Sequence, residues 1–188
     1  MTSTLIPPQP KPSAKLVRKG AIPAVFLAAL ASPFAHQTLE RMEGNILRVY
    51  KDHLANDIPT YCAGRTDWKA PIGKTLTSDE CKEVNAVTLL EYGYAILECV
   101  NWDYLNASRL VGLTVFAINV GKVGACNSAA IREINQGNIV KGCNLIAFKQ
   151  DGTPNWSYAA GVFVNGLFNR RKAERILCLS QSEEIPNG

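Results

Sequence analysis

The sequence lacks the residue combinations that bind metals or activate nucleophiles in many enzymes. It has only two histidines, His36 and His53, and none of its six cysteines stands in a C-x-x-C pair, so a zinc site is not indicated. It has no glycine-rich phosphate-binding loop and no Ser/His/Asp arrangement. We therefore expect neither a metal nor a cofactor.

Acidic residues are absent from positions 1–20, which hold four of the 20 basic residues: Lys11, Lys15, Arg18 and Lys19. Removing these four leaves 16 basic against 16 acidic residues, so the net charge of +4 comes from this segment alone. A near-neutral remainder offers no basic face for nucleic acid, and we expect no nucleic-acid partner. The segment also holds four prolines, which favour an extended leader.

Charged residues are also missing from Gly20 to Leu39. A membrane-spanning helix needs about 20 apolar residues, and Pro23 and Pro33 interrupt this stretch. Three interpretations remain open. The segment is a cleaved signal peptide with Ala29-Leu30-Ala31 as its cleavage motif, a weak membrane anchor with the basic leader held inside, or a buried N-terminal helix, which the prolines and the leader disfavour.

The remaining chain has the composition of one globular domain. Of its 188 residues, 47% are apolar and 19% charged, which indicates a folded core and a single domain over residues 40–180, followed by a tail at 181–188. Six cysteines in an exported chain predict three disulfides, for which the sequence alone allows 15 pairings. In a cytosolic protein the same cysteines would be buried free thiols.

Local patterns predict an α+β fold with a small β lobe, a larger helical lobe and a cleft between them. Thr77 and Glu80 have the spacing of a capping box and begin a long helix whose apolar positions are Val84, Val87, Leu90, Tyr94 and Leu97. Strands are expected at 46–51 and 59–64, an almost wholly apolar helix at 111–120, and shorter helices at 37–43, 128–135, 139–148 and 168–179. A surface loop is expected at 150–155.

Two carboxylates in the first half of the domain lie nine positions apart, Glu43 at the end of a predicted helix and Asp52 after a predicted strand. Glycoside hydrolysis uses such a pair, one acid protonating the leaving oxygen and one carboxylate activating water or attacking. Thr60 follows on the next strand. Taken singly, these residues are an ordinary helix-end acid, a turn aspartate and a strand threonine.

The combined sequence pattern around Glu43, Asp52 and Thr60 is more specific than any of these residues alone. The phrases E-G-x(5)-Y-x-D from Glu43 and T-x-C-x-G-x-T from Thr60 resemble the opening of phage-type lysozymes, the endolysins that cut host peptidoglycan. The resemblance covers about 39–179 and continues through the segments 76–81, 116–121, 133–137, 142–143 and 166–179. The chain resembles in particular the signal-anchor-release endolysins.

This resemblance implies a lysozyme-like fold and hydrolysis of the β-1,4 bond between N-acetylmuramic acid and N-acetylglucosamine, with inversion and host cell lysis. It implies that Glu43 is the general acid, that Asp52 activates the water and that Thr60 positions it. It also implies a monomer and the disulfide pairs Cys62–Cys81, Cys99–Cys126 and Cys143–Cys178.

The resemblance favours the anchor among the interpretations of residues 20–39. The protein would be held inactive at the host inner membrane and released to the periplasm, whereas a cleaved signal peptide would export it directly. No cysteine lies within residues 1–40, so the anchor has no thiol to exchange.

Two departures from the family pattern bear on the site. Seven residues, 53–59, separate Asp52 from Thr60, where the family usually has five, and the longer turn adds Asp57 as a competitor for the water-positioning role. Arg65 stands where relatives usually have histidine, and we expect its role to be structural. Asn119, Arg170 and Arg171 could contact the glycan or have structural contacts, but we favour a core-capping amide for Asn119 and solvated side chains for the two arginines.

Two other functions remain open. A lytic transglycosylase uses one acid and no catalytic aspartate, and it gains weight if the long turn moves Asp52 away. A non-catalytic, membrane-tethered cell-wall-binding protein is the second, and the joint presence of Glu43, Asp52 and Thr60 speaks against it.

Overall fold

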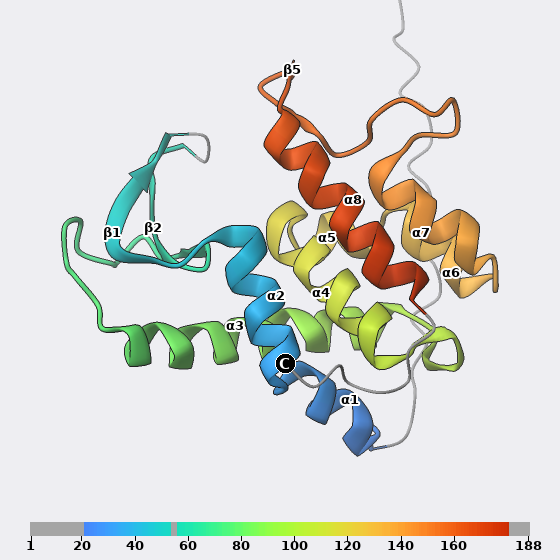
Figure 1. Ribbon diagram of the computed structural model, residues 1–188, viewed down its shortest axis with the longest axis horizontal. Helices are drawn as coiled ribbons and strands as arrows, with labels where there is room; N and C mark the ends of the chain where they lie inside the picture. Colours follow the sequence, from blue (N-terminus) through green and yellow to red (C-terminus); the bar gives the residue numbers. More distant parts are fainter. Residues whose placement is uncertain (1–20, 54–55, 181–188) are drawn as a thin grey trace, which may run out of the picture.

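A small antiparallel sheet stands beside a larger helical body in the computed structural model, which describes residues 21–53 and 56–180 (Figure 1). The elements of the first half are α1 (Ala24–Leu30), α2 (Pro33–Glu43), β1 (Ile46–Asp52), β2 (Ile58–Cys62), β3 (Arg65–Thr66) and α3 (Ser78–Cys99). Those of the second half are the 3₁₀ helix η2 (Trp102–Tyr104), α4 (Ala107–Val120), α5 (Lys122–Cys126), α6 (Ala129–Asn135), α7 (Ile139–Ala147), β4 (Tyr158–Ala159), β5 (Val162–Phe163) and α8 (Asn165–Leu179). The predicted α+β class, with a small β lobe beside a larger helical lobe, is confirmed.

The β lobe is a three-stranded sheet in the order β1-β2-β3. Tyr50 on β1 pairs with Thr60 on β2, and the register shifts between this pair and Ile46. The disulfide Cys62–Cys81 joins β2 to the start of α3 within a small apolar cluster. Both predicted strands are therefore present, with ends displaced by two residues at most.

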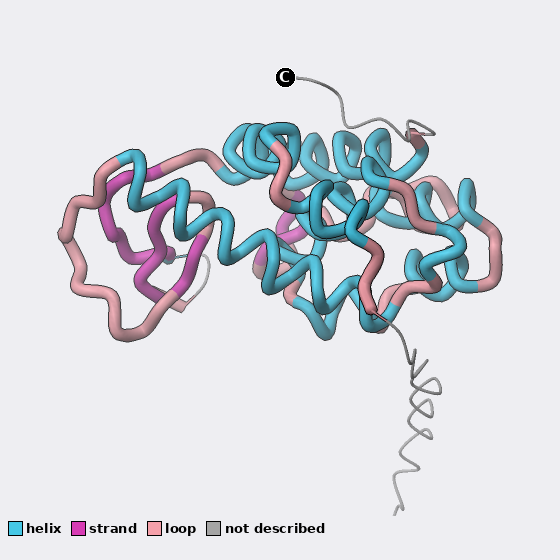
Figure 2. The backbone as a smooth tube through the Cα atoms, turned by 90° about the horizontal axis from the view of Figure 1, so that it is seen from below, coloured by secondary structure: helices cyan, strands magenta, loops and turns pink. Residues whose placement is uncertain are grey.

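Helix α3 runs from beneath the sheet into the helical body (Figures 1 and 2). Its predicted capping box is confirmed, because the Glu80 N–H donates to Thr77 Oγ1 at 3.1 Å and the Thr77 N–H to Glu80 Oε2 at 2.6 Å. The predicted apolar face is largely wrong. Val87, Leu90 and Tyr94 are exposed, and the buried residues are Cys81, Asn85, Thr88, Leu89, Gly93, Ile96 and Leu97.

The physical reason is that several of these buried residues are not large and apolar. Asn85 accepts from the Ala63 N–H at 3.2 Å and so ties the helix to the β lobe. Gly93 leaves room for Leu30, whose Cδ1 would lie 2.4 Å from a Cβ at that position. The spacing of apolar residues in the sequence reveals neither the Asn85 hydrogen bond nor the Gly93–Leu30 contact.

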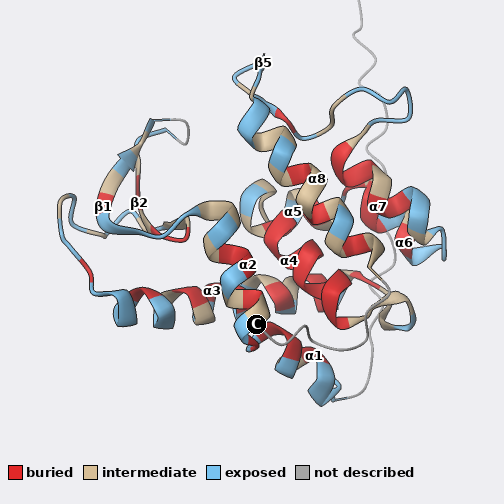
Figure 3. Cartoon of the chain, viewed as in Figure 1, coloured by how far each residue is buried: buried red, intermediate tan, exposed pale blue. Residues whose placement is uncertain are grey.

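Helix α4 lies at the centre of the helical body and is buried along most of its length, as predicted (Figure 3). It packs against α1, α3, α5 and α8. The disulfide Cys99–Cys126 joins α3 to α5, and Cys143–Cys178 joins α7 to α8. All three disulfides match the pairing that the family resemblance implied. Helix α5 and the β4–β5 hairpin were not predicted.

Residues 21–39 of the uncharged N-terminal segment contribute several side chains to the apolar core. Phe26 and Leu30 of α1 are buried in the largest apolar cluster. Pro23 is the N-cap of α1 and Pro33 is the first residue of α2. Backbone N–H groups at the start of a helix have no partner within the helix, so a proline there removes no helical hydrogen bond. The two prolines thus start two helices instead of preventing them, and in this structure α1 is packed as an N-terminal helix. No helix within the described ranges is long and apolar enough to span a bilayer.

Candidate active site

Glu43 is the last residue of α2, and Gly44 ends the helix with a φ of 76° and an N–H bond to Glu40 O at 2.9 Å. Its side chain is turned inward, with only 9% of its surface exposed. Arg170 of α8 donates from Nη1 to Glu43 Oε1 at 2.9 Å and from Nη2 to Met42 O at 2.6 Å. One guanidinium therefore holds both the carboxylate and the end of its helix.

The surroundings of Glu43 shift the pKa of its carboxyl in opposite directions. Burial raises the pKa of the Glu43 carboxyl above its ordinary value, while the positive charges of Arg170 and Arg171 and the Arg170 hydrogen bond lower it. Burial prevails, so the net shift is upward. A carboxyl that keeps its proton closer to neutral pH is suited to act as a general acid.

The β lobe approaches Glu43 through Gly64, in the turn between β2 and β3. A Cβ on Gly64 would lie 3.2 Å from Glu43 Oε2, and the backbone has a φ of 76° there. Both the space and the left-handed conformation favour glycine. Glu43 is therefore enclosed by α8 on one side and by the β2–β3 turn on another.

Asp52 and Thr60 lie on the adjoining strands. Asp52 ends β1, and Thr60 sits on β2 opposite Tyr50. Burial raises the Tyr50 pKa, and the charges of Asp52 and Glu43 raise it further, so Tyr50 lies within the electrostatic reach of both carboxylates. Thr60 is buried, and its Oγ1 donates to Ile58 O at 3.1 Å. The fold thus brings Glu43 and Asp52 to the same region, with Thr60 on the neighbouring strand.

The described residues of the β1–β2 turn, His53, Asn56 and Asp57, are exposed. Asn56 and Asp57 adopt positive φ angles, and the Asp57 N–H donates to Asp52 O at 2.9 Å. The Asp57 carboxylate is 58% exposed and pairs with His53 Nδ1 at 2.5 Å. Asp57 is therefore engaged within its own turn.

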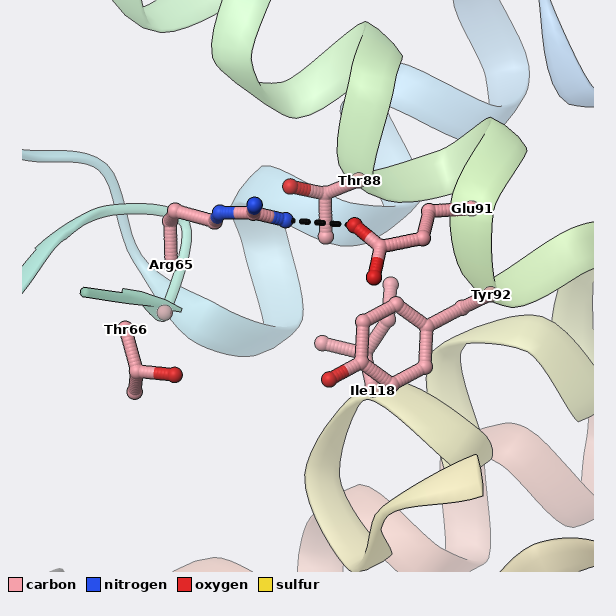
Figure 4. Close-up of a pocket in the computed structure, with 7 residues that line it drawn as sticks. Arg65, Thr66, Thr88, Glu91, Tyr92 and Ile118 are labelled. Atoms are coloured by element: carbon pink, nitrogen blue, oxygen red, sulfur yellow. Dashed lines mark hydrogen bonds and ion pairs between the residues drawn. The ribbon is translucent and has the colours of Figure 1, made fainter. Parts of the chain in front are cut away.

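A pocket of about 140 Å³ includes Gly64, whose Cβ position lies 3.2 Å from Glu43 Oε2. Figure 4 shows the other side chains that line this pocket. The pocket is lined by Gly64, Arg65, Thr66, Thr88, Glu91, Tyr92 and Ile118. Pockets that bind whole small molecules measure about 300–1,000 Å³, so this pocket has room for one substituent of a larger ligand.

Arg65 has the structural role expected of it. It donates to Glu91 Oε2 at 2.7 Å, and Lys122 contacts Glu91 Oε1 at 2.6 Å. The three side chains connect β3, α3 and α5. No group of three or more His, Cys, Asp or Glu side chains within residues 21–53 and 56–180 could hold a metal ion.

Three expectations for polar residues around this site are wrong. Asn119 is exposed at the end of α4 and does not cap the core. Arg170 is not a solvated arginine, because it binds Glu43, and Arg171 is fully buried and bonded to Glu174. Sequence reasoning also gave no role to Gly64. The R-R-x-x-E sequence at residues 170–174 was the available signal for the arginines, since it places two adjacent arginines and one acid on one helix.

Comparison with known proteins agrees with these features. Residues 40–174 match the family model for phage lysozyme. The chain belongs to the phage lysozyme family.

Two related proteins are described as SAR-endolysins. That of Bacteriophage PS119 is 33% identical over 138 residues, covering 73% of this chain and 77% of its own. That of Enterobacteria phage PA-2 is 31% identical over 169 residues, covering 90% and 94%. Among solved structures, a mutant of P22 lysozyme aligns with a TM-score of 0.62 at 26% identity, covering 79% of this chain and 97% of its own.

Proposed function

We propose that this protein is an endolysin that hydrolyses the β-1,4 bond between N-acetylmuramic acid and N-acetylglucosamine in bacterial peptidoglycan and so lyses the host cell. The observation that carries this proposal is Glu43, an enclosed carboxyl with a raised pKa, bonded to Arg170 and adjoined by Asp52 on the next element. Membership of the phage lysozyme family supports the same reaction class.

In the proposed reaction Glu43 donates its proton to the glycosidic oxygen as the bond to the anomeric carbon breaks. A water held by Asp52 attacks that carbon from the opposite face and passes a proton to the Asp52 carboxylate, which gives inversion. Thr60 helps to position the water. Arg170 fixes the direction of the Glu43 carboxyl and stabilises the carboxylate that remains after proton transfer.

The composition of the products tests this reaction. Purified peptidoglycan would be digested and the released muropeptides analysed by mass. Hydrolysis predicts reducing ends, whereas 1,6-anhydro ends would show a lytic transglycosylase that does not use Asp52. Binding to peptidoglycan without any released product would show a cell-wall-binding protein.

We further propose that residues 20–39 hold the new protein at the host inner membrane and that the protein is released intact to the periplasm as a monomer. The names of the related SAR-endolysins support this proposal. The described structure then corresponds to the released form, because Phe26 and Leu30 are in the core. A segment inside the bilayer is unavailable for that packing, so the tethered protein lacks part of its core beside α3 and α4.

Cell fractionation before and after treatment with an uncoupler tests this localisation, together with N-terminal sequencing of the soluble protein. The proposal predicts an intact N-terminus that moves from the membrane to the periplasmic fraction. A soluble protein that begins near Ser32 or His36 from the outset would show a cleaved signal peptide.

A further inference from the structure

Two carboxyls and two arginines form one charged cluster between α2 and α8. Arg170 donates to Glu43 at 2.9 Å, and Arg171 donates to Glu174 at 2.6 Å. The first pair is partly exposed, whereas both members of the second are fully buried. We call these four residues the arginine–glutamate cluster. The proposed reaction uses its first pair and gives no role to the second.

The hydrogen bonding of the buried pair is incomplete. Arg171 Nε and Nη1 and Glu174 Oε2 are buried and have no hydrogen-bond partner among the described residues. A carboxylate ion beside a buried arginine is expected to accept two parallel N–H bonds, and a charged oxygen left unpaired in the core is costly. An unpaired oxygen costs less on a neutral carboxylic acid. The single bond therefore favours a Glu174 that keeps its proton, and burial raises the pKa of Glu174 to about 8.

A protonated Glu174 fixes the Arg171 side chain without cancelling its charge. The carbonyl oxygen of a neutral acid still accepts a hydrogen bond. Arg171 is also held from α4, because its guanidinium carbon lies 5.2 Å from the centroid of the Phe116 ring, whose face attracts a cation. Burial lowers the pKa of Arg171, yet an arginine in a protein keeps its proton. The buried pair then has a net positive charge.

This charge acts on the candidate acid. The charge of Arg171 lowers the pKa of Glu43 and is the second charge to do so after Arg170. The effect is mutual within the cluster, because the charge of Glu43 raises the pKa of Glu174. Charges that are buried or partly buried are screened little by solvent and salt. The second pair therefore belongs electrostatically to the Glu43 site.

The helices packed against α8 add no second cluster of this kind. Helix α4 carries Arg109 as its one charged residue, and Arg109 donates to Tyr104 O and Cys178 O. Helix α7 carries only Lys141, which pairs with Glu133. Both cations are thus engaged away from Glu43.

The elements around Glu43 itself carry several titratable or charged groups. Those on α2 and β1 are His36, Glu40, Arg41, Arg48, Tyr50, Lys51 and Asp52. Among the described residues, however, the charges that shift the Glu43 pKa are those of Arg170 and Arg171. The proton of Glu43 is therefore governed by burial and by these two arginines.

We propose that Arg171 is a positioning residue for the reaction at Glu43, and that Glu174 holds it as a neutral carboxylic acid so that the whole guanidinium charge acts on Glu43. This charge limits how far burial raises the pKa of Glu43 and stabilises the carboxylate that remains after proton transfer. The inference rests on the proposed function, because it takes Glu43 as the acid.

An ionised Glu174 is the alternative. Its pair with Arg171 would have no net charge, and Arg170 alone would then offset the burial of Glu43. In that case the buried pair would contribute to packing and not to the reaction.

The test compares three variants of the full-length protein by their pH profiles of kcat/KM. Arg171→Met removes the buried charge, and Glu174→Gln keeps a neutral acceptor for Arg171. Arg175→Met is the matched control, because Arg175 lies on the same helix, binds Asn144 at 2.7 Å and is not among the charges that shift the Glu43 pKa. Thermal unfolding checks that each variant is folded.

We expect Arg171→Met to move the alkaline limb to higher pH, since Glu43 then keeps its proton more firmly. At a fixed pH on this limb, kcat/KM relative to its maximum should rise about threefold or more, because the lost charge is poorly screened. Arg175→Met and Glu174→Gln should leave the limb at its wild-type pH. An unmoved limb in Arg171→Met would overturn the inference. A limb at lower pH in Glu174→Gln would also overturn it, because an ionised Glu174 must then have cancelled the charge of Arg171.

A second measurement needs neither activity nor the loss of an arginine. NMR titration of the glutamate side-chain carboxyls gives the midpoint of Glu174 in wild type and in Glu43→Gln. We expect a lower midpoint in Glu43→Gln, because the negative charge that raises the pKa of Glu174 is gone. An unmoved midpoint, or a Glu174 that is ionised throughout, would overturn the inference. If wild type released no product from peptidoglycan, the proposed function would fail, while this titration would still decide whether the two carboxyls are coupled.

Discussion

Arg171 donates from Nη2 to Glu174 Oε1 at 2.6 Å, and both side chains are fully buried. Burial raises the pKa of Glu174 to about 8 against the opposing charges of Arg171 and Arg170. The pair lies on α8 next to Arg170, which holds Glu43. Helix α8 therefore carries both the buried Arg171–Glu174 pair and Arg170, which contacts the candidate acid Glu43.

Replacing Glu174 with Gln should change how stability depends on pH. The folded protein keeps the Glu174 proton up to about pH 8, whereas the unfolded chain loses it near 4.5. Between these values the folded state binds more protons, so wild-type stability should fall as pH rises, by up to about 1.4 kcal/mol per pH unit from this group. Glu174→Gln removes this contribution, and its amide oxygen can still accept from Arg171.

Chemical denaturation from about pH 4 to about pH 9 measures this effect. The quantity compared is the free energy of unfolding of wild type minus that of Glu174→Gln at each pH. Glu43 also has a raised pKa and adds the same downward slope to both proteins, so it cancels in the difference. Parallel curves for wild type and Glu174→Gln across this range would show that Glu174 is ionised in the folded protein throughout.

Glu43→Gln should abolish product release with little change in stability. The amide keeps the shape of the side chain and an oxygen for Arg170 but has no proton to transfer. Reducing-end release from purified peptidoglycan measures activity, and thermal unfolding checks the fold. Substantial activity in a folded Glu43→Gln protein would remove Glu43 from the role of acid.

Arg170→Met should move the alkaline limb of the activity profile to higher pH and lower kcat. The Arg170 charge and hydrogen bond both lower the Glu43 pKa, so their loss leaves the acid protonated over a wider range, while the carboxyl loses its direction. A pH profile of kcat/KM measures the pH at which this alkaline limb falls. Lys141→Met, which removes an exposed charge on α7, is the control and should leave the limb in place; an unmoved limb in Arg170→Met would contradict the role assigned to this arginine.

The sequence was sufficient for the parts of this fold that depend on local signals. The capping box at Thr77, the strands around the Tyr50–Thr60 pair and the largely apolar helix α4 are all present. The family motif supplied the disulfide pairing, which spacing alone left open among 15 possibilities. These features depend on short-range patterns or on a shared ancestor.

The remaining features depend on contacts between distant residues. Gly93 accepts Leu30 from 63 positions away, and Arg170 reaches Glu43 across 127 positions. No periodicity encodes that a glycine makes room for a particular leucine or that one of two adjacent arginines binds the acid. Pro23 and Pro33 indicated interruption, but whether they interrupt a span or begin two packed helices depends on the tertiary structure.

Asp52→Ala should reduce activity more than Asp57→Ala. Asp52 lies within the electrostatic reach of Tyr50, as Glu43 does, whereas Asp57 pairs with His53 at an exposed tip. We expect a loss of about a hundredfold or more in kcat for Asp52→Ala, the usual range for a general base, and less than about threefold for Asp57→Ala. Reducing-end assays on the two variants decide the matter, and a greater loss in Asp57→Ala would transfer the water-positioning role to the longer turn.

Gly93→Ala tests whether α1 packs against α3 in the soluble protein. A Cβ at position 93 would lie 2.4 Å from Leu30 Cδ1, and Leu30 is fully buried, so we expect a loss of about 1–3 kcal/mol in the free energy of unfolding from overpacking. Leu30→Ala alone should cost about 2–5 kcal/mol. In the Leu30→Ala background the added methyl group has space, and Gly93→Ala should become neutral or stabilising through its better helix propensity.

This cycle also distinguishes the fates of the N-terminal segment. A protein cleaved after Ala31 has no Leu30, so Gly93→Ala would then stabilise it, and Leu30→Ala would leave the mature protein unchanged. Chemical denaturation of the four soluble proteins measures the coupling between the two positions. A coupling of about 1 kcal/mol or more means that α1 is retained and packed against α3, as it must be if the segment leaves the membrane intact and completes the core.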